Sequence, residues 1–544
     1  MTDWNFADLW ETVAEAHPDA PAVVQGGRVT SWADFDRRAD AVAAGLLGAG
    51  LGQQAKVAQY LYNQPEYLES LYACFKAGLA PVNTNYRYTE DELVYLWDNA
   101  DAEAVVFDDA FTERVEAVRG RLPRVRLWLW VGPGTASPPP WATSYAEMLT
   151  NSPAGSVRAT WGRRGDDLLL IYTGGTTGMP KGVMWRQDDL FCILNRTGEL
   201  RYPEDGNLDD ARAVLAAPPR HAPPKLIPGP PLMHGTGLFT AMSVLDSAGC
   251  IVLLEGRHFS AEELLDTVVA EAVTELSIVG DAFAKPILAA LDAEPDRWDL
   301  SSLWLIISSG VMWSAEVKAG LLRHAPRLLM IDNLGSSEAL GMARSQSKLG
   351  QTSATAGFQL GPQTRVITED GRDVVPGTGE SGLVALRGRG PVGYYKDPTK
   401  TAATFRVIDG VRWTIPGDFA TVSADGEIKL LGRGSVCINT GGEKVFPEEV
   451  EEALKLHPAV ADAVVVGVPH ERFGEAVVAV VESRPSSGGD AADEGDLVAW
   501  VKDRLASYKA PRHVVAVDTI GRAANGKVDY KRLRELAIAE VGAR

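Results

Sequence analysis

Short apolar runs that favour β-strands alternate along this chain with segments of helical periodicity. The runs lie at residues 104–107, 125–131, 168–172, 250–254, 276–279, 305–307 and 328–331. Residues 261–270 have a helical pattern, and an amphipathic first helix is predicted from Phe6, Leu9, Trp10 and Val13. Such alternation predicts an α/β fold of layered, mostly parallel sheets.

The size and charge of the chain limit its organisation and its partners. At 544 residues it is too long for one ordinary core, so we expect a large domain and a smaller one. Its formal net charge of −19 disfavours nonspecific binding to nucleic acid or to anionic lipid. No segment approaches the ~20 apolar residues of a membrane-spanning helix, and the first residues lack the pattern of a secretory signal.

The cysteines are few and scattered, and no Cys-x-x-Cys spacing occurs among them: Cys74, Cys192, Cys250 and Cys437. This usage suggests neither a zinc site nor a disulfide framework. We therefore expect a reduced, cytoplasmic setting.

A loop suited to holding phosphate follows the apolar run at 168–172. Glycines let backbone N–H groups turn towards an anion, threonines add hydroxyl donors, and a lysine adds charge. Lys181 follows a proline and precedes a glycine, so the loop is not the Gly-x-x-x-x-Gly-Lys-Ser/Thr nucleotide loop, and it has no dinucleotide fingerprint. The predicted phosphate-binding residues are Thr173, Gly174, Gly175, Thr176, Thr177, Gly178 and Lys181.

Two further loops present groups suited to the same chemistry. His234 lies between prolines and glycines, and the proline-rich stretch 218–231 before it is either a stiff approach to this histidine or a plain surface loop. Glu338 follows the apolar run at 328–331, at a strand end where α/β sheets place ligands, and its carboxylate could hold Mg²⁺. The alternative for Glu338 is an ordinary surface carboxylate.

The last third of the chain contains three more candidate motifs. Pro416-Gly417 is a turn that presents Asp418. Its carboxylate can accept hydrogen bonds from both hydroxyl groups of a ribose. A strand-like run ends at Arg433, and a glycine turn precedes a helix that begins with proline near residue 447. Lys527 follows an Asn-Gly turn; from this feature alone, a solvated lysine is the simpler interpretation.

Taken in order from Tyr172 to Lys527, these motifs resemble those of the adenylate-forming superfamily, which includes acyl-CoA synthetases, luciferases and peptide-synthetase adenylation domains. Four positions depart from the usual family residues: Gly174 in place of Ser, Leu334 in place of Tyr, Pro416 in place of Thr, and Ser435 in place of Asp or Lys. Leu334 replaces a tyrosine that commonly stacks on adenine, so we expect apolar contact there instead.

The resemblance implies a role for each motif. It implies catalytic roles for Lys527, His234, Thr177 and Glu338, with Glu338 also the Mg²⁺ ligand. It implies ATP or AMP binding by the phosphate loop together with Ser309, Gly310, Gly335, Ser336, Ser337, Asp418, Arg433 and Lys527. It implies a hinge at Ser435, and a thioester step served by Gly441, Gly442 and Glu443.

The resemblance also implies an architecture and a reaction. The expected domains are residues 1–432, with layered α/β sheets, and a small mobile α+β domain, 433–544, joined by a hinge near 433–435. The expected activity is that of an AMP-forming acyl-CoA synthetase that uses ATP, CoA and Mg²⁺ on a long-chain or steroid-derived carboxylate. The alternatives are an adenylate-forming ligase for another carboxylate (aryl or medium-chain) or another acceptor, and a catalytically silent nucleotide-binding relative; a homo-oligomer is left open.

Overall fold

The computed structural model describes residues 3–151, 155–173, 179–196, 198–218, 221–433, 438–440, 443–470, 473–484, 493–523 and 528–542. These residues form two compact units. The first comprises the described residues of 3–173, 179–355 and 387–406, and the second those of 356–386 and 407–542. Residues on both sides of position 433 belong to the second unit, so the domain boundary expected there stays a prediction.

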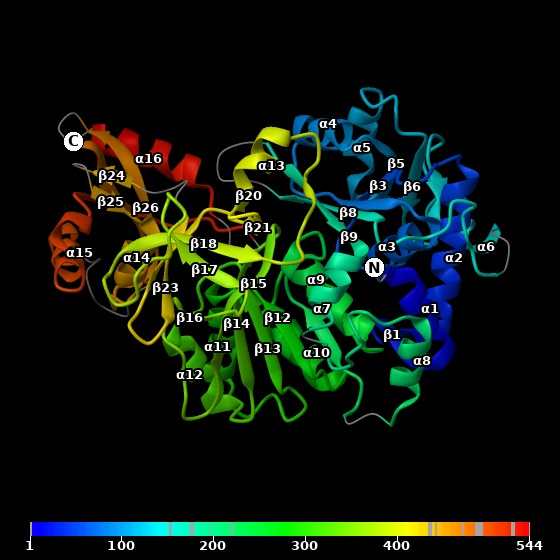
Figure 1. Ribbon diagram of the computed structural model, residues 1–544, viewed down its shortest axis with the longest axis horizontal. Coiled ribbons are helices and arrows are strands. Elements are labelled where there is room, and N and C mark those ends of the chain that lie inside the picture. Colours follow the sequence, from blue (N-terminus) through cyan, green and yellow to red (C-terminus); the bar gives the residue numbers. More distant parts are fainter. Residues whose placement is uncertain are drawn as a thin grey trace. The chain divides into compact units, whose positions relative to one another are not determined.

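The first unit contains two layered sheets (Figure 1). In one, the strand order is β2-β1-β11-β10-β12-β13-β14-β15. Its strands are β1 (Pro21–Gln25), β2 (Arg28–Ser31), β10 (Lys225–Pro228), β11 (Cys250–Leu253), β12 (Glu275–Ile278), β13 (Leu305–Ser309), β14 (Leu329–Ser336) and β15 (Ala339–Ser347). From β1 to β14 the neighbours are parallel, and β2 and β15 add antiparallel edges to this run.

The other sheet of the first unit has the order β19-β9-β8-β4-β3-β5-β6-β7. Its strands are β3 (Lys56–Tyr60), β4 (Ala80–Asn83), β5 (Ala102–Asp108), β6 (Leu127–Val131), β7 (Thr143–Ser144), β8 (Leu168–Thr173), β9 (Lys181–Arg186) and β19 (Gly393–Tyr394). The pairs from β8 to β7 are parallel, whereas β9 is antiparallel to both β8 and β19. The expected parallel, layered α/β architecture is therefore confirmed in this unit.

Helices cover these sheets and supply much of the core. They are α1 (Phe6–Ala16), α2 (Trp32–Gly48), α3 (Pro65–Ala77), α4 (Glu90–Asn99), α5 (Thr112–Arg119), α6 (Tyr145–Asn151), α7 (Gln187–Leu194), α8 (Leu208–Ala216), α9 (Gly235–Asp246), α10 (Ala261–Ala270), α11 (Asp281–Ala293), α12 (Ala315–His324) and α13 (Pro398–Thr404). Among the described residues, no helix is both long and apolar enough to cross a bilayer.

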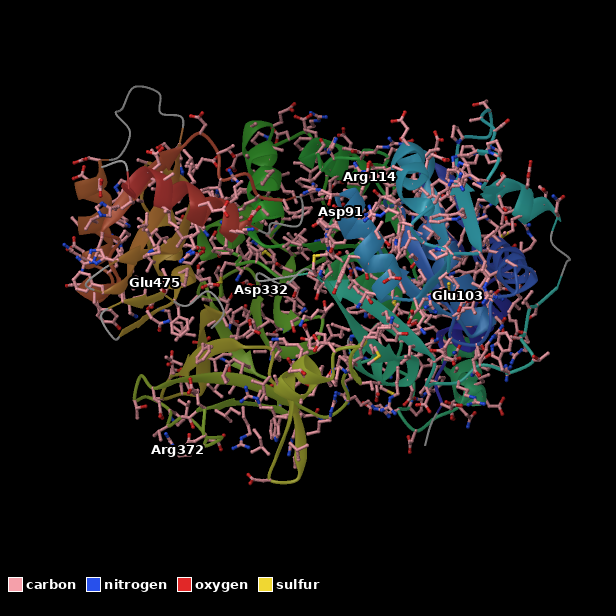
Figure 2. The ribbon with its side chains drawn as sticks, turned by 90° about the horizontal axis from the view of Figure 1, so that it is seen from above. Asp91, Glu103, Arg114, Asp332, Arg372 and Glu475 are labelled. Atoms are coloured by element: carbon pink, nitrogen blue, oxygen red, sulfur yellow. The ribbon has the colours of Figure 1, made fainter. Side chains whose placement is uncertain are left out.

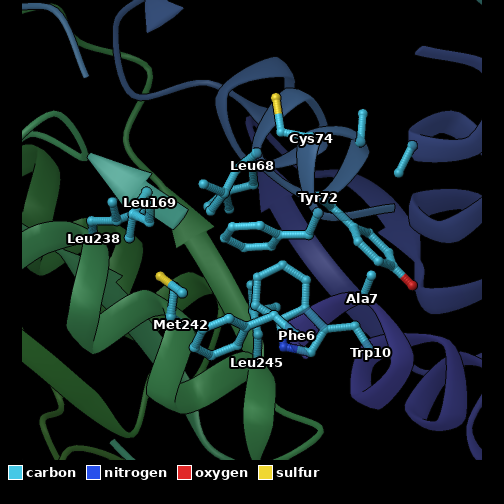
Figure 3. Close-up of a cluster of buried hydrophobic side chains, with 14 of the residues drawn as sticks. Phe6, Ala7, Trp10, Leu68, Tyr72, Cys74, Leu169, Leu238, Met242 and Leu245 are labelled. Atoms are coloured by element: carbon cyan, nitrogen blue, oxygen red, sulfur yellow. The ribbon is translucent and has the colours of Figure 1, made fainter. Parts of the chain in front are cut away.

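The first helix forms where its apolar spacing predicts. Asn5 caps α1 by accepting from the Ala7 N–H, and the apolar face is fully buried. Figure 3 shows Phe6 and Trp10 of α1 packed among side chains from other helices, including Tyr72. The Trp10 and Tyr72 rings meet edge to face with centroids 5.2 Å apart. The helix therefore belongs to the main core.

The second unit is built mainly from antiparallel strands. One group has the order β16-β23-β22-β18-β21-β20, with β17 paired to β18. These strands are β16 (Gly357–Leu360), β17 (Thr364–Ile367), β18 (Ser381–Arg387), β20 (Phe405–Ile408), β21 (Val411–Thr414), β22 (Asp418–Val422) and β23 (Glu427–Arg433).

The C-terminal part of the second unit has a small sheet of its own and three helices within the described residues. The order is β25-β24-β27-β26, and β28 pairs in parallel with β27. The elements are β24 (Ile438–Thr440), β25 (Glu443–Val445), α14 (Pro447–Lys455), β26 (Val460–His470), β27 (Gly474–Ser483), α15 (Glu494–Lys502), β28 (His513–Val517) and α16 (Tyr530–Gly542). The expected α+β composition of this part is confirmed.

Charged side chains lie both on the surface and in the interior. Asp91, Glu103, Arg114, Asp332, Arg372 and Glu475 are labelled in Figure 2. Asp91 and Arg372 are exposed, whereas Asp332, in the middle of β14, is buried. Arg114 donates to the Tyr60 hydroxyl over 2.9 Å and to the carbonyls of Tyr86 and Tyr88. It thereby links the end of β3 to the segment that contains Tyr86 and Tyr88.

Candidate active site

The phosphate loop connects two adjacent antiparallel strands of the first unit. β8 ends at Thr173 and β9 begins at Lys181, and these two residues lie directly opposite each other in the register. Strand pairing therefore fixes the base of the loop and the position of its lysine. The predicted residues Gly174, Gly175, Thr176, Thr177 and Gly178 lie outside the described part of the chain.

Asn83, at the end of β4, is a residue that the sequence analysis missed. Its buried amide accepts from the Tyr172 N–H over 2.6 Å and donates to the Tyr172 carbonyl over 2.9 Å. The same amide donates to the Met233 carbonyl over 2.6 Å. One side chain thus connects the strand before the phosphate loop with the segment that carries His234. An Asn that ends a buried apolar strand was the available signal.

His234 occupies the N-cap position of α9 with an extended backbone. The following turn is tight, because a Cβ on Gly237 would lie 2.6 Å from the Pro230 carbonyl oxygen. A Cβ on Gly235 would lie 3.6 Å from the Ser337 hydroxyl oxygen. The structure therefore brings the histidine motif against the Ser337-Glu338 motif, which is a hundred residues away in sequence.

The proline-rich stretch before His234 is not a plain surface loop, because a buried strand lies within it. It contains β10, which pairs in parallel with β11 on one side and β12 on the other. Leu226 and Ile227 are fully buried. Only the last residue of this strand, Pro228, lacks a backbone N–H, so the interior of the strand keeps its ladder.

Ser337 and Glu338 form the turn between β14 and β15. β14 continues to Ser336, so Gly335 and Ser336 lie in the strand itself. The Ser337 carbonyl accepts from the Trp185 indole over 2.9 Å. The Glu338 carboxylate accepts from the Tyr394 hydroxyl over 2.7 Å. Both residues of the turn are thus held by aromatic side chains of the neighbouring sheet.

Ser309 ends β13, and Ser309 is paired with Asn333 of β14 in parallel register. Gly310 follows with φ +97°, a left-handed conformation that favours glycine. Because the carboxyl ends of parallel strands meet at one edge, Ser309 and Gly310 lie on the same side as the Asn333–Ser336 segment. This edge is where open α/β sheets bind their ligands.

Two carboxylates of the first unit, Asp397 before α13 and Asp332 within β14, have pKa values shifted in opposite directions. Hydrogen bonds from Lys181, over 2.6 Å, and from the Lys400 N–H hold the pKa of Asp397 below its usual value. Burial raises the pKa of Asp332 to about 6, although Lys318 lies 3.5 Å away. The Asp397 side chain is therefore ionised at neutral pH.

The second unit carries the candidate ribose residues. Asp418 begins β22 and is buried, with 6% of its surface exposed. It lies directly opposite Arg433, the last residue of β23, in the antiparallel register. The side chains of Arg433 and Glu443 lie outside the described part, as do Ser435, Gly441, Gly442 and Lys527.

The donor set at the Glu338 turn fits Mg²⁺. This cation prefers one or two carboxylates plus the oxygens of phosphate and water. Among the described residues, no group of three or more His, Cys, Asp or Glu could hold a metal by itself. A single carboxylate at a turn fits a cation that takes its other ligands from phosphate or water oxygens.

Comparison with known proteins places these motifs in a family. The AMP-binding enzyme model matches residues 10–395, and the AMP-binding enzyme C-terminal domain model matches residues 449–527. A medium/long-chain-fatty-acid–CoA/3-oxocholest-4-en-26-oate–CoA ligase of Mycobacterium tuberculosis is 40% identical, over 98% of this chain and 96% of that protein. A 3-oxocholest-4-en-26-oate–CoA ligase of Rhodococcus rhodochrous is 38% identical, over 97% of this chain and 95% of that protein.

A solved structure agrees on the fold. The crystal structure of the anthranilate CoA ligase AuaEII in complex with anthranoyl-AMP superposes with a TM-score of 0.84 at 22% identity, covering 99% of this chain and 98% of that one. With family models that match both parts of the chain and relatives that match nearly all of it, this chain belongs to the AMP-binding enzymes of the adenylate-forming superfamily.

Proposed function

We propose that this protein is an ATP-dependent acyl-CoA ligase that activates a long-chain or steroid-derived carboxylate. The observation that carries this proposal is the 40% identity, over nearly the whole length of both chains, with a ligase named for fatty acids and 3-oxocholest-4-en-26-oate. ATP and CoA as co-substrates favour the cytoplasm as the place of action.

The reaction has two halves. A carboxylate oxygen of the acid attacks the α-phosphorus of ATP, the bond to pyrophosphate breaks, and an acyl-adenylate forms. The CoA sulfur then attacks the acyl carbon after its thiol proton has left, and the C–O bond to AMP breaks. Negative charge grows on phosphoryl oxygens in the first half, so preorganised donors there are the main catalytic device.

We assign phosphate and metal binding in the first half to three motifs of the first unit. Lys181 and the loop before it would hold the β- and γ-phosphates, His234 would lie beside the α-phosphate and acyl group, and Glu338 would hold Mg²⁺. When bound, this cation would neutralise charge on the phosphates. Two links in the first unit support these assignments: Asn83 joins the strand before Lys181 to the His234 segment, and that segment approaches Ser337, the neighbour of Glu338.

The nucleoside and the reacting phosphate would be held by the remaining motifs. Ser309 and Gly310 would line the adenine site, and Asp418 with Arg433 would bind the ribose. Lys527 would neutralise the charge that develops on the α-phosphate, and Gly441, Gly442 and Glu443 would serve the thioester step after movement about Ser435. The adjacent register of Asp418 and Arg433 supports the ribose assignment.

The proposal is tested with a panel of acids. Pyrophosphate release is measured with fatty acids of increasing length, a 3-oxo steroid carboxylate, ferulate and benzoate, with and without CoA, and thioesters are identified by mass spectrometry. We expect turnover and thioester formation with the long-chain or steroid acids. A preference for ferulate or benzoate would show that the substrates are aryl acids instead. No pyrophosphate release with any acid would indicate a catalytically silent nucleotide-binding protein.

A further inference from the structure

One short segment reaches two of the charged groups assigned to ATP binding. It comprises β19 and the start of α13, residues 393–400. The Tyr394 hydroxyl donates to Glu338 over 2.7 Å, and three residues later the Asp397 carboxylate accepts from Lys181 over 2.6 Å. Glu338 and Lys181 come from different sheets, so this segment connects groups that no single strand carries.

The segment is held by its own hydrogen bonds. Tyr394 is paired with Val183 of β9, two residues beyond Lys181. The Thr401 hydroxyl accepts from the Tyr394 N–H over 2.9 Å and donates to the Asp397 carbonyl over 2.7 Å. Tyr394 is buried and its ring contacts Phe405. The Tyr394 and Asp397 side chains therefore project from one segment whose backbone is held in place by hydrogen bonds.

Each contact leaves its partner able to bind ligand. The Tyr394 hydroxyl engages one oxygen of the Glu338 carboxylate, and a carboxylate has a second oxygen for a cation. A lysine ammonium has three donors, of which Asp397 takes one. The other Asp397 oxygen accepts from the Lys400 N–H over 2.8 Å, which compensates part of its charge beside the phosphates.

We propose that Tyr394 and Asp397 are positioning residues for ATP binding: Tyr394 orients the Glu338 carboxylate towards Mg²⁺, and Asp397 orients Lys181 towards the phosphates. This inference rests on the roles proposed above for Glu338 and Lys181. Partners that orient a metal-binding carboxylate commonly contribute 10–100-fold to metal affinity, although they never touch the metal. A purely structural Tyr394 would affect stability and leave the effect of Mg²⁺ unchanged.

The test measures ATP binding by calorimetry to the full-length protein, once in EDTA and once in saturating MgCl₂. The variants are Tyr394→Phe, which keeps the ring, and Glu338→Gln as reference. Tyr395→Phe is the matched control, because its hydroxyl donates to Asp101 over 2.8 Å and not to Glu338. Thermal unfolding of each variant shows that it is folded.

We expect Mg²⁺ to tighten ATP binding by the unsubstituted protein and by Tyr395→Phe equally. In Tyr394→Phe the tightening falls by about 10-fold, with affinity in EDTA unchanged. A wild-type response to Mg²⁺ in Tyr394→Phe, while Glu338→Gln loses it, would overturn the role of Tyr394 alone. If Glu338→Gln also keeps the response, the proposed role of Glu338 fails and the inference fails with it.

Asp397→Asn tests the second contact. Asparagine can still accept from the Lys400 N–H, but it removes the ion pair with Lys181. Because a half-exposed ion pair contributes little, we expect ATP binding in EDTA to weaken roughly three-fold. The effect of Mg²⁺ should stay as in the unsubstituted protein. Equal or tighter binding in EDTA would show that Asp397 does not position Lys181.

Discussion

Glu275 is the first residue of β12, and 5% of its surface is exposed. Burial raises its pKa to about 7, and the charge of Glu199 adds to the shift. Since the folded state then binds a proton more tightly than the unfolded chain, this group contributes stability below pH 4.5. That contribution is lost as the pH rises through about 7.

Replacing Glu275 with Gln should remove this loss. At pH 8 the free energy of unfolding should rise by roughly 3 kcal/mol relative to the unsubstituted protein, because no charge is then buried. At pH 4.5 the two proteins should differ little. Urea denaturation at both pH values measures the difference, and an equal gain at both would show that packing rather than ionisation is responsible.

Glu11 shows the opposite shift. Burial would raise its pKa, but the hydrogen bond from Arg163 and the charges of Lys76 and Arg163 outweigh burial and lower the pKa to about 2. Lys76 donates to Glu11 over 2.8 Å, and Arg163 donates with two nitrogens over 2.7 Å each. Its stabilising contribution is present above pH 4.5 and is lost as the pH falls through 2.

Glu11→Gln should therefore destabilise the protein at pH 7 by roughly 3 kcal/mol, since it leaves two buried cations with less opposite charge. The variant should also lose less stability between pH 4.5 and pH 2.5 than the unsubstituted protein. Denaturation curves across this range measure both effects. A variant that loses stability in acid as steeply as the unsubstituted protein would assign the acid sensitivity to another carboxylate.

At the scale of elements, the site depends on strands that are linked by side chains. β8 and the His234 segment share Asn83, whose amide makes three hydrogen bonds in a buried position. Removal of that amide leaves the Tyr172 N–H and two carbonyls without this partner. Each buried group that loses its partner costs about 1–3 kcal/mol.

Asn83→Ala should lower the free energy of unfolding by about 3 kcal/mol. It should also weaken ATP binding, because β8 and the His234 turn lose their connection. Thermal unfolding and calorimetry measure the two effects. The control is Asn85→Ala nearby, whose amide accepts only from the Arg87 N–H among the described contacts. Normal ATP affinity in a destabilised Asn83→Ala would confine Asn83 to a structural role.

The sequence predicts elements whose signal is local. The apolar periodicity of α1 and the apolar runs of β8, β13 and β14 suffice, because burial follows directly from that pattern. β10 has only two apolar residues between prolines and is a strand because β11 and β12 supply its partners.

The candidate site also contains residues that local sequence patterns indicate and residues that they do not. Lys181, His234 and Glu338 belong to recognisable motifs, and the sequence indicates them. Asn83 and Tyr394 act through contacts with residues more than 50 positions away. No local pattern contains such contacts, since they depend on strand order and register, which are properties of the folded sheets.

At the scale of the whole molecule, the proposed reaction requires one C-terminal region to serve two chemical steps. Lys527 is assigned to adenylate formation, and Gly441, Gly442 and Glu443 to thioester formation. A lysine bound to the α-phosphate would obstruct the CoA thiol, and we propose that rotation about Ser435 exchanges the two groups. The two halves should therefore be separable by substitution.

Lys527→Ala should reduce adenylate formation by at least ~10²-fold, because it removes a donor aimed at developing charge. Thioester formation from supplied acyl-adenylate should stay close to that of the unsubstituted protein. Gly442→Trp should do the reverse, since a bulky side chain would block the approach of CoA while ATP still reacts. Pyrophosphate exchange measures the first half, and chromatography of the thioester measures the second. Equal loss of both halves in either variant would contradict the exchange and favour a single arrangement that serves both steps.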